Sequence, residues 1–308
     1  MKVAILAGGT GGTKLAHGFA MLPHVELTVI ANVGDDVEMH GLLVCPDIDA
    51  VLYTLSGLLD TDRGWGVRGD THTARAMFER LGEPTWFSVG DADLATHAHR
   101  ARLMHDGASL TGAVASMASA LGIAARILPA TDDRHRTVLD TDAGPMEFQE
   151  YFVRHRQEPE VRSVRLDGNA LPSSAMLAAL GEAELIVIGP SNPIVSIGPI
   201  LALPGVEDAI RASGSPVVAV SPIIAGRALK GPADRMLASL GHAATAAGVA
   251  GIYAGLADRF VVDDVDRELA ASIQRDTGLA VDVLPTVMRV DDDRRALAAA
   301  LVGLRARL

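Results

Sequence analysis

Residues 1–18, MKVAILAGGTGGTKLAHG, decide the fold of this 308-residue chain. The run 3–6 is short and apolar, as in a buried strand, and a glycine-rich stretch then leads into a helical pattern that we expect to begin near Thr13. A strand, a glycine loop and a helix in this order form a good anion cradle, because backbone N–H groups and the positive end of the helix dipole face the loop. The opening stretch therefore predicts a sheet that holds an anion at one strand end.

Two common phosphate-binding motifs do not match this stretch. The dinucleotide motif G-x-G-x-x-G has Lys14 in place of its third glycine, and the P-loop motif has Thr13 where a glycine must precede the lysine. A tight turn without a ligand is the alternative interpretation. It is disfavoured because so many glycines would then cost conformational entropy without a function.

Strand and helix patterns alternate along most of the chain, which is typical of a parallel sheet covered by helices. After the first strand, further strands are expected at 27–31, 185–189, 217–220, 260–262 and 281–284. The expected fold is a doubly wound, mostly parallel, Rossmann-like α/β sheet in a single domain over residues 1–308. Within it, a smaller mixed or antiparallel insertion lobe is expected at about 128–170, in a region whose short strands are expected at 126–129, 137–140 and 146–153.

Composition restricts the function classes. A net charge of −11 and a pI near 5.3 argue against a broad basic nucleic-acid-binding face, so no nucleic-acid partner is expected. The single cysteine, Cys45, excludes a disulfide framework and a thiolate metal cluster within one chain. The uncharged runs 185–206 and 236–257 are interrupted by prolines or are mostly alanine and glycine, so we expect no membrane span and a cytoplasmic protein.

Four aspartates follow the second predicted strand. Asn32 ends that strand, Asp35 and Asp36 follow it, and Asp47 and Asp49 open the next predicted helix. Carboxylates at the ligand-binding edge of an open α/β sheet favour a hard cation such as Mg²⁺, bound together with substrate phosphates. The structural alternatives are a helix N-cap for Asp47 and a helix-dipole partner for Asp49.

A second polar cluster follows a strand-like run at 85–89. Asp91 and Asp93 begin a predicted helix, and His97 and Arg100 lie three residues apart on one face of it. This cluster is a candidate for recognising a polar ligand, and a purely structural histidine is the alternative.

Neutral hydrogen-bonding groups follow a later strand. Ser191 and Asn192 come directly after the apolar run 185–189 and could donate to phosphate or to base edges. The chain has no G-x-S-x-G nucleophile motif, and Cys45 has no obvious base beside it. A metal-assisted reaction between two bound substrates therefore fits better than covalent catalysis.

Together these blocks resemble the 2-phospho-L-lactate transferase family, which builds the phosphodiester of the deazaflavin coenzyme F-420. The resemblance is nearly full length and includes the glycine-rich start and the blocks that begin at Asn32, Cys45, Asp62, Gly90, Phe148, Gly189 and Ser221. It implies transfer of a phospholactyl or phosphoenolpyruvyl group to the deazaflavin Fo. The implied donor is lactyl-2-diphospho-5'-guanosine or its enolpyruvyl analogue, and the implied products are GMP and F-420-0 or dehydro-F-420-0.

The resemblance also implies roles for particular residues. Asp35 and Asp49 would bind Mg²⁺ with Asp36 in reserve, and the catalytic base stays open among these three aspartates. Candidate Fo-binding residues are Asp49, Ser88, Asp91, His97 and Arg100; Ser88 stands where some archaeal members carry a lysine. Candidate donor-binding residues are Gly9, Thr10, Gly11, Gly12, Lys14, Asn32, Ser191 and Asn192. The family further suggests a homodimer.

A regulator of carbon metabolism that binds a nucleotide sugar without turnover is the alternative function. Such chains share the glycine loop and the Gly-Pro-Ser segment, but they are expected to lack the DRGWG block at 62–66 and the GDADLATH block at 90–97, which this chain has. An NAD-dependent oxidoreductase is disfavoured because Asn32, not an acid, ends the second strand.

Overall fold

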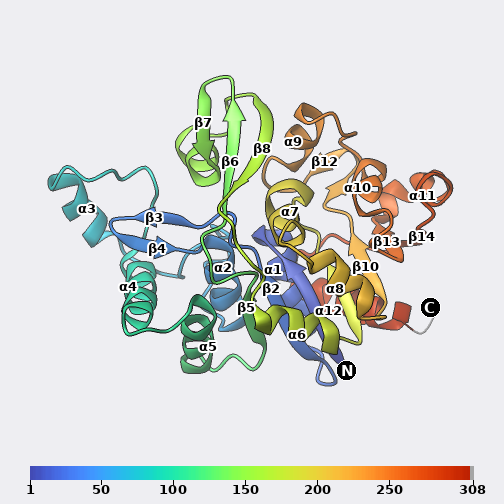
Figure 1. The fold of residues 1–308 in the computed structure, drawn as a ribbon, viewed down its shortest axis with the longest axis horizontal. Helices are drawn as coiled ribbons and strands as arrows, with labels where there is room; N and C mark the ends of the chain where they lie inside the picture. Colours follow the sequence, from blue (N-terminus) through green and yellow to red (C-terminus); the bar gives the residue numbers. More distant parts are fainter. Residues whose placement is uncertain (306–308) are drawn as a thin grey trace.

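The computed structural model describes residues 1–305 and confirms the predicted fold class, a seven-stranded parallel sheet with helices on both faces (Figure 1). Across the sheet the strands are β14 (Ala280–Val283), β13 (Arg259–Val262), β10 (Val217–Val220), β9 (Leu185–Ile188), β1 (Lys2–Ala7), β2 (Glu26–Ala31) and β5 (Arg126–Pro129). All neighbouring strands are parallel. The chain moves from β1 to one side and returns to the other side at β9. This reversal is where an open α/β sheet leaves a crevice for ligands.

Each face of the sheet is covered by its own helices. One face carries α1 (Gly9–Ala20), α2 (Pro46–Leu55), α5 (Leu110–Ala120) and α12 (Asp291–Leu304). The other face carries α6 (Ser174–Glu182), α7 (Gly198–Leu201), α8 (Val206–Ala212), α10 (Ala246–Tyr253) and α11 (Ala270–Thr277).

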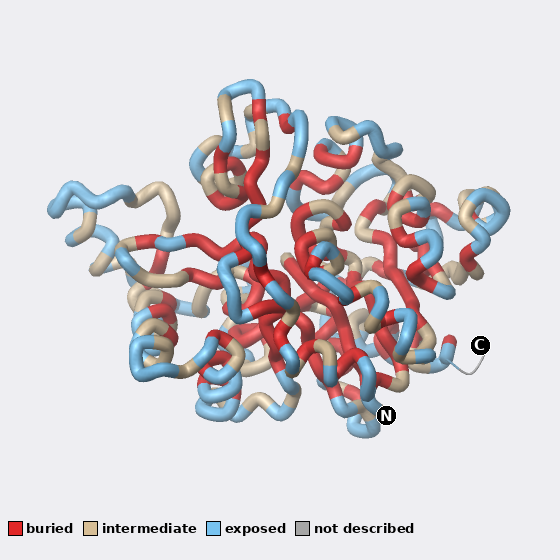
Figure 2. The backbone as a smooth tube through the Cα atoms, in the orientation of Figure 1, coloured by how far each residue is buried: buried red, intermediate tan, exposed pale blue. Residues whose placement is uncertain are grey.

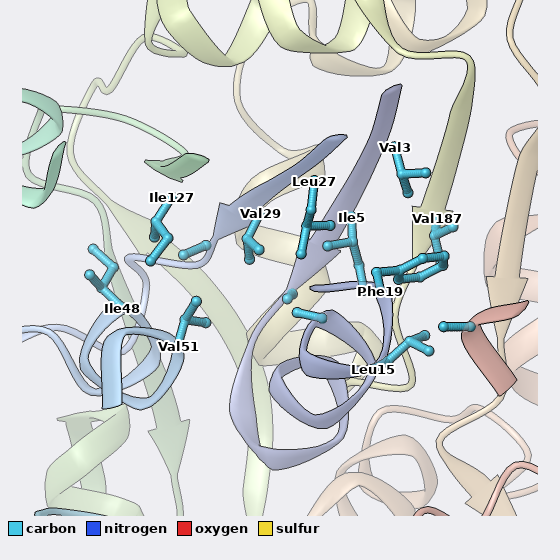
Figure 3. Packing of buried hydrophobic residues seen from close by; sticks show 14 of the residues in the cluster. Val3, Ile5, Leu15, Phe19, Leu27, Val29, Ile48, Val51, Ile127 and Val187 are labelled. Carbon is cyan, nitrogen blue, oxygen red and sulfur yellow. The ribbon is translucent and has the colours of Figure 1, made fainter. Parts of the chain in front are cut away.

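Successive strand residues supply the two cores. Ile5 of β1 packs with Leu15 and Phe19 of α1 on the first face, whereas Leu6 belongs to the core of the second face (Figure 3). The sheet is the most continuously buried part of the molecule (Figure 2). Burial on both faces explains why the central strands β9 and β10 are short, continuous apolar runs in the sequence.

Helix α1 begins at Gly9, four residues before the position expected from the sequence. The glycines had been interpreted as a loop because glycine disfavours helices. They are required for packing instead, because a Cβ on Gly11 would lie 2.0 Å from the carbonyl oxygen of Pro190 and one on Gly12 would lie 2.5 Å from Ser191 Oγ. The first turn of α1 therefore lies directly against the loop that follows β9.

The antiparallel addition is a three-stranded sheet, in the order β7 (Gly144–Glu147), β6 (Arg136–Thr141) and β8 (Val161–Asp167), at the top of Figure 1. The sequence had grouped 126–129 with this region, but that segment is β5, which pairs in parallel with β2 in the main sheet. The strand expected at 146–153 is also partly wrong, because a π-helical turn η1 (Glu150–Arg154) follows β7. Phe148, Tyr151 and Phe152 have a helical spacing and pack into the core of this sheet.

The remaining elements surround the carboxyl edge of the main sheet. They are β3 (Val37–Met39), β4 (Leu42–Val44), α3 (Thr73–Arg80), α4 (Asp91–His105), η2 (Pro193–Ile197), β11 (Ile223–Ile224), β12 (Arg227–Ala228), α9 (Ala233–Ser239) and η3 (Asp264–Leu269). The run 85–89 forms no strand; Trp86 and Phe87 instead pack on the β3–β4 hairpin.

Within residues 1–305, no single helix is both long and apolar enough to cross a membrane. One bent pair, Pro193–Leu201 with Val206–Ala212 at 76°, meets that test by length and composition alone.

Candidate functional site

A cleft of about 870 Å³ lies at the carboxyl edge of the sheet, where the strand order reverses. Loops after β1, β2, β9 and β10 line it, together with η1 and the segment between β12 and α9. Eight of the fifteen residues to which the resemblance gives a role line this cleft, and Asp47 lines it as well; the eight are Gly9, Thr10, Gly11, Lys14, Asp35, Ser88, Ser191 and Asn192. The other seven lie outside its lining: Gly12, Asn32, Asp36, Asp49, Asp91, His97 and Arg100.

The N-terminus of α1 is fixed from two sides. The backbone N–H of Gly8 donates to Ser191 Oγ at 3.3 Å, and the N–H of Gly9 donates to Asp47 Oδ1 at 2.5 Å. A Cβ on Gly8 would lie 2.7 Å from Ser196 Cβ, so only glycine fits there. The first turn of a helix has N–H groups without helical partners, and here that turn opens into the cleft at Thr10 and Gly11.

Two carboxylates lie beside this helix end. Asp47 is in the first turn of α2, after the N-cap residue Cys45, and its Oδ2 accepts from Asn32 Nδ2 at 2.9 Å. It is therefore not the N-cap that the sequence offered as an alternative. Oδ1 of Asp35 is buried without a hydrogen-bond partner among the described residues. Burial first, and then the Asp47 carboxylate, raises the pKa of Asp35 well above its ordinary value, so this pair favours a cation or a proton between them.

A buried network occupies the space behind α2. Arg100, fully buried on α4, donates through Nη2 to Asp49 Oδ1. Nδ1 of His97 lies 3.5 Å from Asp49 Oδ2, and Nε2 of His97 lies 3.4 Å from Asp93 Oδ1, which accepts from Tyr53 Oη at 2.6 Å. The sequence correctly placed His97, Arg100 and Asp93 on one side of a helix. Both oxygens of the Asp49 carboxylate are engaged within the protein.

The remaining predicted Fo contact on α4 is a hydrogen-bonding hub at the surface. Asp91 Oδ2 accepts from the Thr71 hydroxyl and from the N–H of Thr73, and Oδ1 accepts from the N–H of Ala74. These bonds, the Thr71 bond first, lower the pKa of Asp91 to about 2. Asp91 thereby joins the start of α4 to the start of α3.

Asp36 anchors the antiparallel sheet to the acidic loop. Its Oδ2 lies 3.8 Å from Arg136 Nη1, and the N–H of Thr137 donates to the carbonyl oxygen of Gly34 at 2.8 Å. Burial raises the pKa of Asp36 to about 7, although Arg136 opposes the shift. The adjacent aspartates thus have different surroundings, since Asp35 faces the cleft and Asp36 faces an arginine.

An aromatic wall is the part of the cleft that the sequence reasoning missed. Of the eleven Phe, Trp and Tyr residues in the chain, five line the cleft: Trp65, Trp86, Phe87, Phe148 and Phe152. Phe148 and Phe152 stack with ring centroids 5.5 Å apart, and Trp86 meets Phe87 edge to face. The available signal was the scarcity of aromatic residues, which make up 4% of the chain.

A helix N-terminus, a carboxylate pair and an aromatic wall line one cleft at the switch point of this α/β protein. The family model of the 2-phospho-L-lactate transferase CofD matches residues 3–297. The chain belongs to this transferase family.

Relatives span almost the whole chain. It is 38% identical to a phosphoenolpyruvate transferase from Streptomyces griseus, over 97% of this chain and 96% of that protein. It is also 38% identical to a 2-phospho-L-lactate transferase from Methanococcoides burtonii, over 92% of each. A crystal structure of a UPF0052 family member from Bacillus halodurans superposes with a TM-score of 0.64 at 18% identity, covering 98% of this chain and 99% of that one, and supports the fold.

Proposed function

We propose that this protein transfers a phospholactyl or phosphoenolpyruvyl group from a guanosine diphosphate-linked donor to the deazaflavin Fo, releasing GMP and forming F-420-0 or dehydro-F-420-0. The observation that carries the proposal is that Asp35 and Asp47 line the same cleft as the N-terminus of α1 and the aromatic wall. Group transfer between two bound molecules needs positioning and charge neutralisation more than a protein nucleophile.

The donor's phosphates fit at the start of α1. Thr10 and Gly11 line the cleft in the first turn of α1, where N–H groups have no partner within the helix, and Ser191 and Asn192 line it from the loop after β9. Asn192 Oδ1 already accepts from the N–H of Ile194 at 2.9 Å, which holds that loop in place. Neutral donors of this kind bind phosphate without requiring a broadly basic protein.

The acceptor fits on the aromatic side. Trp86, Phe87 and Ser88 form one edge of the cleft, and Phe148 and Phe152 form another. Flat rings offer stacking area for a deazaflavin, while its hydroxylated side chain reaches toward the aspartates. The hydroxyl oxygen then attacks the phosphorus nearest the lactyl or enolpyruvyl group, and GMP leaves.

Asp35 and Asp47 fit Mg²⁺, and this pair differs from the Asp35 and Asp49 expected from the resemblance. Asp35 brings an unpartnered buried oxygen, whereas the Asp49 carboxylate is engaged by Arg100 and His97. Asp35 and Asp47 supply only two carboxylates, so substrate oxygens or water would complete the coordination of Mg²⁺. When bound, Mg²⁺ would neutralise charge on the transferring phosphoryl group.

The proposal is tested by titrating the protein with Fo and following deazaflavin fluorescence, with and without Mg²⁺ and GDP, and then by offering the lactyl and enolpyruvyl donors. Saturable Fo binding and product formation are expected. Tight binding of a nucleotide sugar with no Fo binding would instead indicate a regulator.

The metal assignment has its own readout. Asp35→Asn should fold normally, because it removes a buried charge without breaking a hydrogen bond of Oδ1, but it should abolish the rise in melting temperature caused by Mg²⁺ with GDP. The matched control is Asp208→Asn on the exposed side of α8, which should keep that rise. An unchanged Mg²⁺ response in Asp35→Asn would refute the assignment.

A further inference from the structure

Three side-chain carboxamides line the cleft, those of Gln149, Gln157 and Asn192, and two of them are already engaged within the protein. Oε1 of Gln157 accepts from Arg235 Nη2 at 2.7 Å. Oδ1 of Asn192 accepts from the N–H of Ile194 at 2.9 Å. The carboxamide of Gln149 differs, because it makes no hydrogen bond within the part of the chain that the structure describes.

This free carboxamide is not a surface group, since Gln149 is only 6% exposed. A carboxamide has one oxygen acceptor and two N–H donors, and buried polar groups in proteins nearly always have partners. Leaving such a group unpaired destabilises a protein. The partners of Gln149 must therefore come from the cleft that it lines, from water in the free protein and from a ligand in the complex.

Core packing fixes the position of Gln149. It is the N-cap residue of η1 and has helical backbone angles of φ −68° and ψ −34°. Phe148 before it and Tyr151 after it are both buried in the core of the antiparallel sheet. The N–H of His155 donates to the carbonyl oxygen of Glu150 at 3.0 Å and closes the turn. The carboxamide is thus held on a packed element, so little conformational entropy is lost when a ligand binds to it.

The surroundings of Gln149 in the cleft are apolar and partly aromatic. Phe148 precedes it, Phe152 and Val153 follow it, and all three line the cleft. The rings of Phe148 and Phe152 are stacked with their centroids 5.5 Å apart. An apolar wall with one neutral carboxamide favours a planar ring whose faces are apolar and whose edge carries hydrogen-bonding groups.

The pyrimidinedione ring of a deazaflavin has such an edge, with one N–H between two carbonyl groups. Oε1 of Gln149 can accept from that N–H while Nε2 donates to one of the carbonyl oxygens, because a carboxamide offers both an acceptor and donors. A carboxylate could only accept, and an ammonium could only donate. Guanine also has an N–H beside a carbonyl group. However, Gln149 lies in the same segment as Phe148 and Phe152, which favours the ring of the acceptor.

We propose, resting on the proposed function, that Gln149 binds the N–H and the adjacent carbonyl group of the acceptor's pyrimidinedione ring. These two hydrogen bonds fix the ring within its own plane, whereas stacking on the aromatic wall alone would allow it to slide and rotate. They therefore set the direction in which the hydroxylated side chain of the acceptor leaves the ring. They also make the site specific, because a ring without the N–H would leave the buried carboxamide unpaired.

The test compares Fo with a derivative that is methylated on this ring nitrogen, by fluorescence titration of the full chain. The wild type should bind Fo about 10- to 100-fold more tightly than the methylated ring. Gln149→Leu removes both hydrogen bonds at similar volume, so it should bind Fo about 10- to 100-fold more weakly and should bind the two rings alike. Gln274→Leu, the same change at an exposed position of α11, is the matched control and should behave as the wild type.

Equal Fo affinity in the wild type and in folded Gln149→Leu would overturn the proposal, and circular dichroism melts establish that the variant is folded. A weakened variant that still discriminates against the methylated ring would also overturn it, because Gln149 would then only shape the pocket. The comparison of the two rings on the wild type needs no variant. Equal affinity of the wild type for both rings would therefore overturn the proposal even if Gln149→Leu did not fold.

Calorimetric titration with GMP identifies which ring the carboxamide binds. GMP affinity should be the same in the wild type and in Gln149→Leu, whereas a loss of GMP affinity with intact Fo affinity would overturn the proposal in favour of guanine. The wild type separates this proposal from the proposed function. Saturable binding of Fo leaves the proposed function standing when the role of Gln149 fails, whereas no binding of Fo to the wild type removes both.

Discussion

Replacing Arg100 by Met tests the buried network behind α2 and should strongly destabilise the fold. Arg100 is 0% exposed and Asp49 is 4% exposed, so the substitution leaves a buried carboxylate without its main partner. Breaking one side of a buried ion pair costs about 3–5 kcal/mol, and we expect about 3 kcal/mol because His97 remains 3.5 Å from Asp49. Urea unfolding followed by circular dichroism measures this loss directly.

Two further measurements test the same ion pair, namely the pH dependence of the stability of Arg100→Met and the stability of a double variant. Without the guanidinium, the folded-state pKa of Asp49 rises further above its unfolded value. The variant is then least destabilised at low pH and loses stability as the pH rises through the folded pKa. Arg100→Met combined with Asp49→Leu should recover most of the loss, because an apolar pair replaces the ion pair. A loss below about 1 kcal/mol at pH 8, or a double variant no better than Arg100→Met, would refute this reasoning.

Two further changes test the packing around the cleft. Gly11→Ala places a Cβ 2.0 Å from the carbonyl oxygen of Pro190, so it should lower both the melting temperature and the affinity for GDP. The control is Gly251→Ala, which has open space around its Cβ and should change neither quantity. Equal behaviour of the two variants in both assays would refute the close contact at α1. Burial lowers the pKa of His135, whose Nε2 bonds the carbonyl oxygen of Pro199 at 2.9 Å, so the contribution of His135 to stability should fall as the pH drops below about 6.5. His135→Gln should remove that contribution, so its stability relative to the wild type should rise between pH 7 and 5 in urea unfolding, and an unchanged difference would contradict the assignment.

The main sheet could be predicted from the sequence because its strands are buried on both faces. The central strands β9 and β10 are uninterrupted apolar runs, whereas the edge strand β14 contains Asp282, and helical periodicity separates the strands. The start of α1 could not be predicted in the same way. Its glycines have a low helix propensity, so the sequence does not indicate a helix there. A side chain at Gly11 would collide with the carbonyl oxygen of Pro190, which is far away in the sequence.

The candidate site was predictable where its residues directly follow strands, because parallel strands end at one edge. Gly9, Asp35 and Ser191 all reach the cleft for that reason. The aromatic wall and Lys230 lie in segments whose positions depend on tertiary packing, and no local spacing places them there. Asp49 shows the opposite case. It follows β2 closely in the sequence, but its carboxylate accepts from Arg100 of α4 and it does not line the cleft.

The charge arrangement reconciles an acidic chain with the anionic donor that we propose. The net charge of −11 lowers the tendency of anions to approach the whole molecule, but binding depends on the field within the cleft. There, Asp47 accepts from the N–H of Gly9 at the first residue of α1, and Lys14 and Lys230 line the same cleft. Two lysines and the N–H groups at the start of a helix supply a positive potential inside the cleft, so an anion can bind there although the whole chain carries a negative charge.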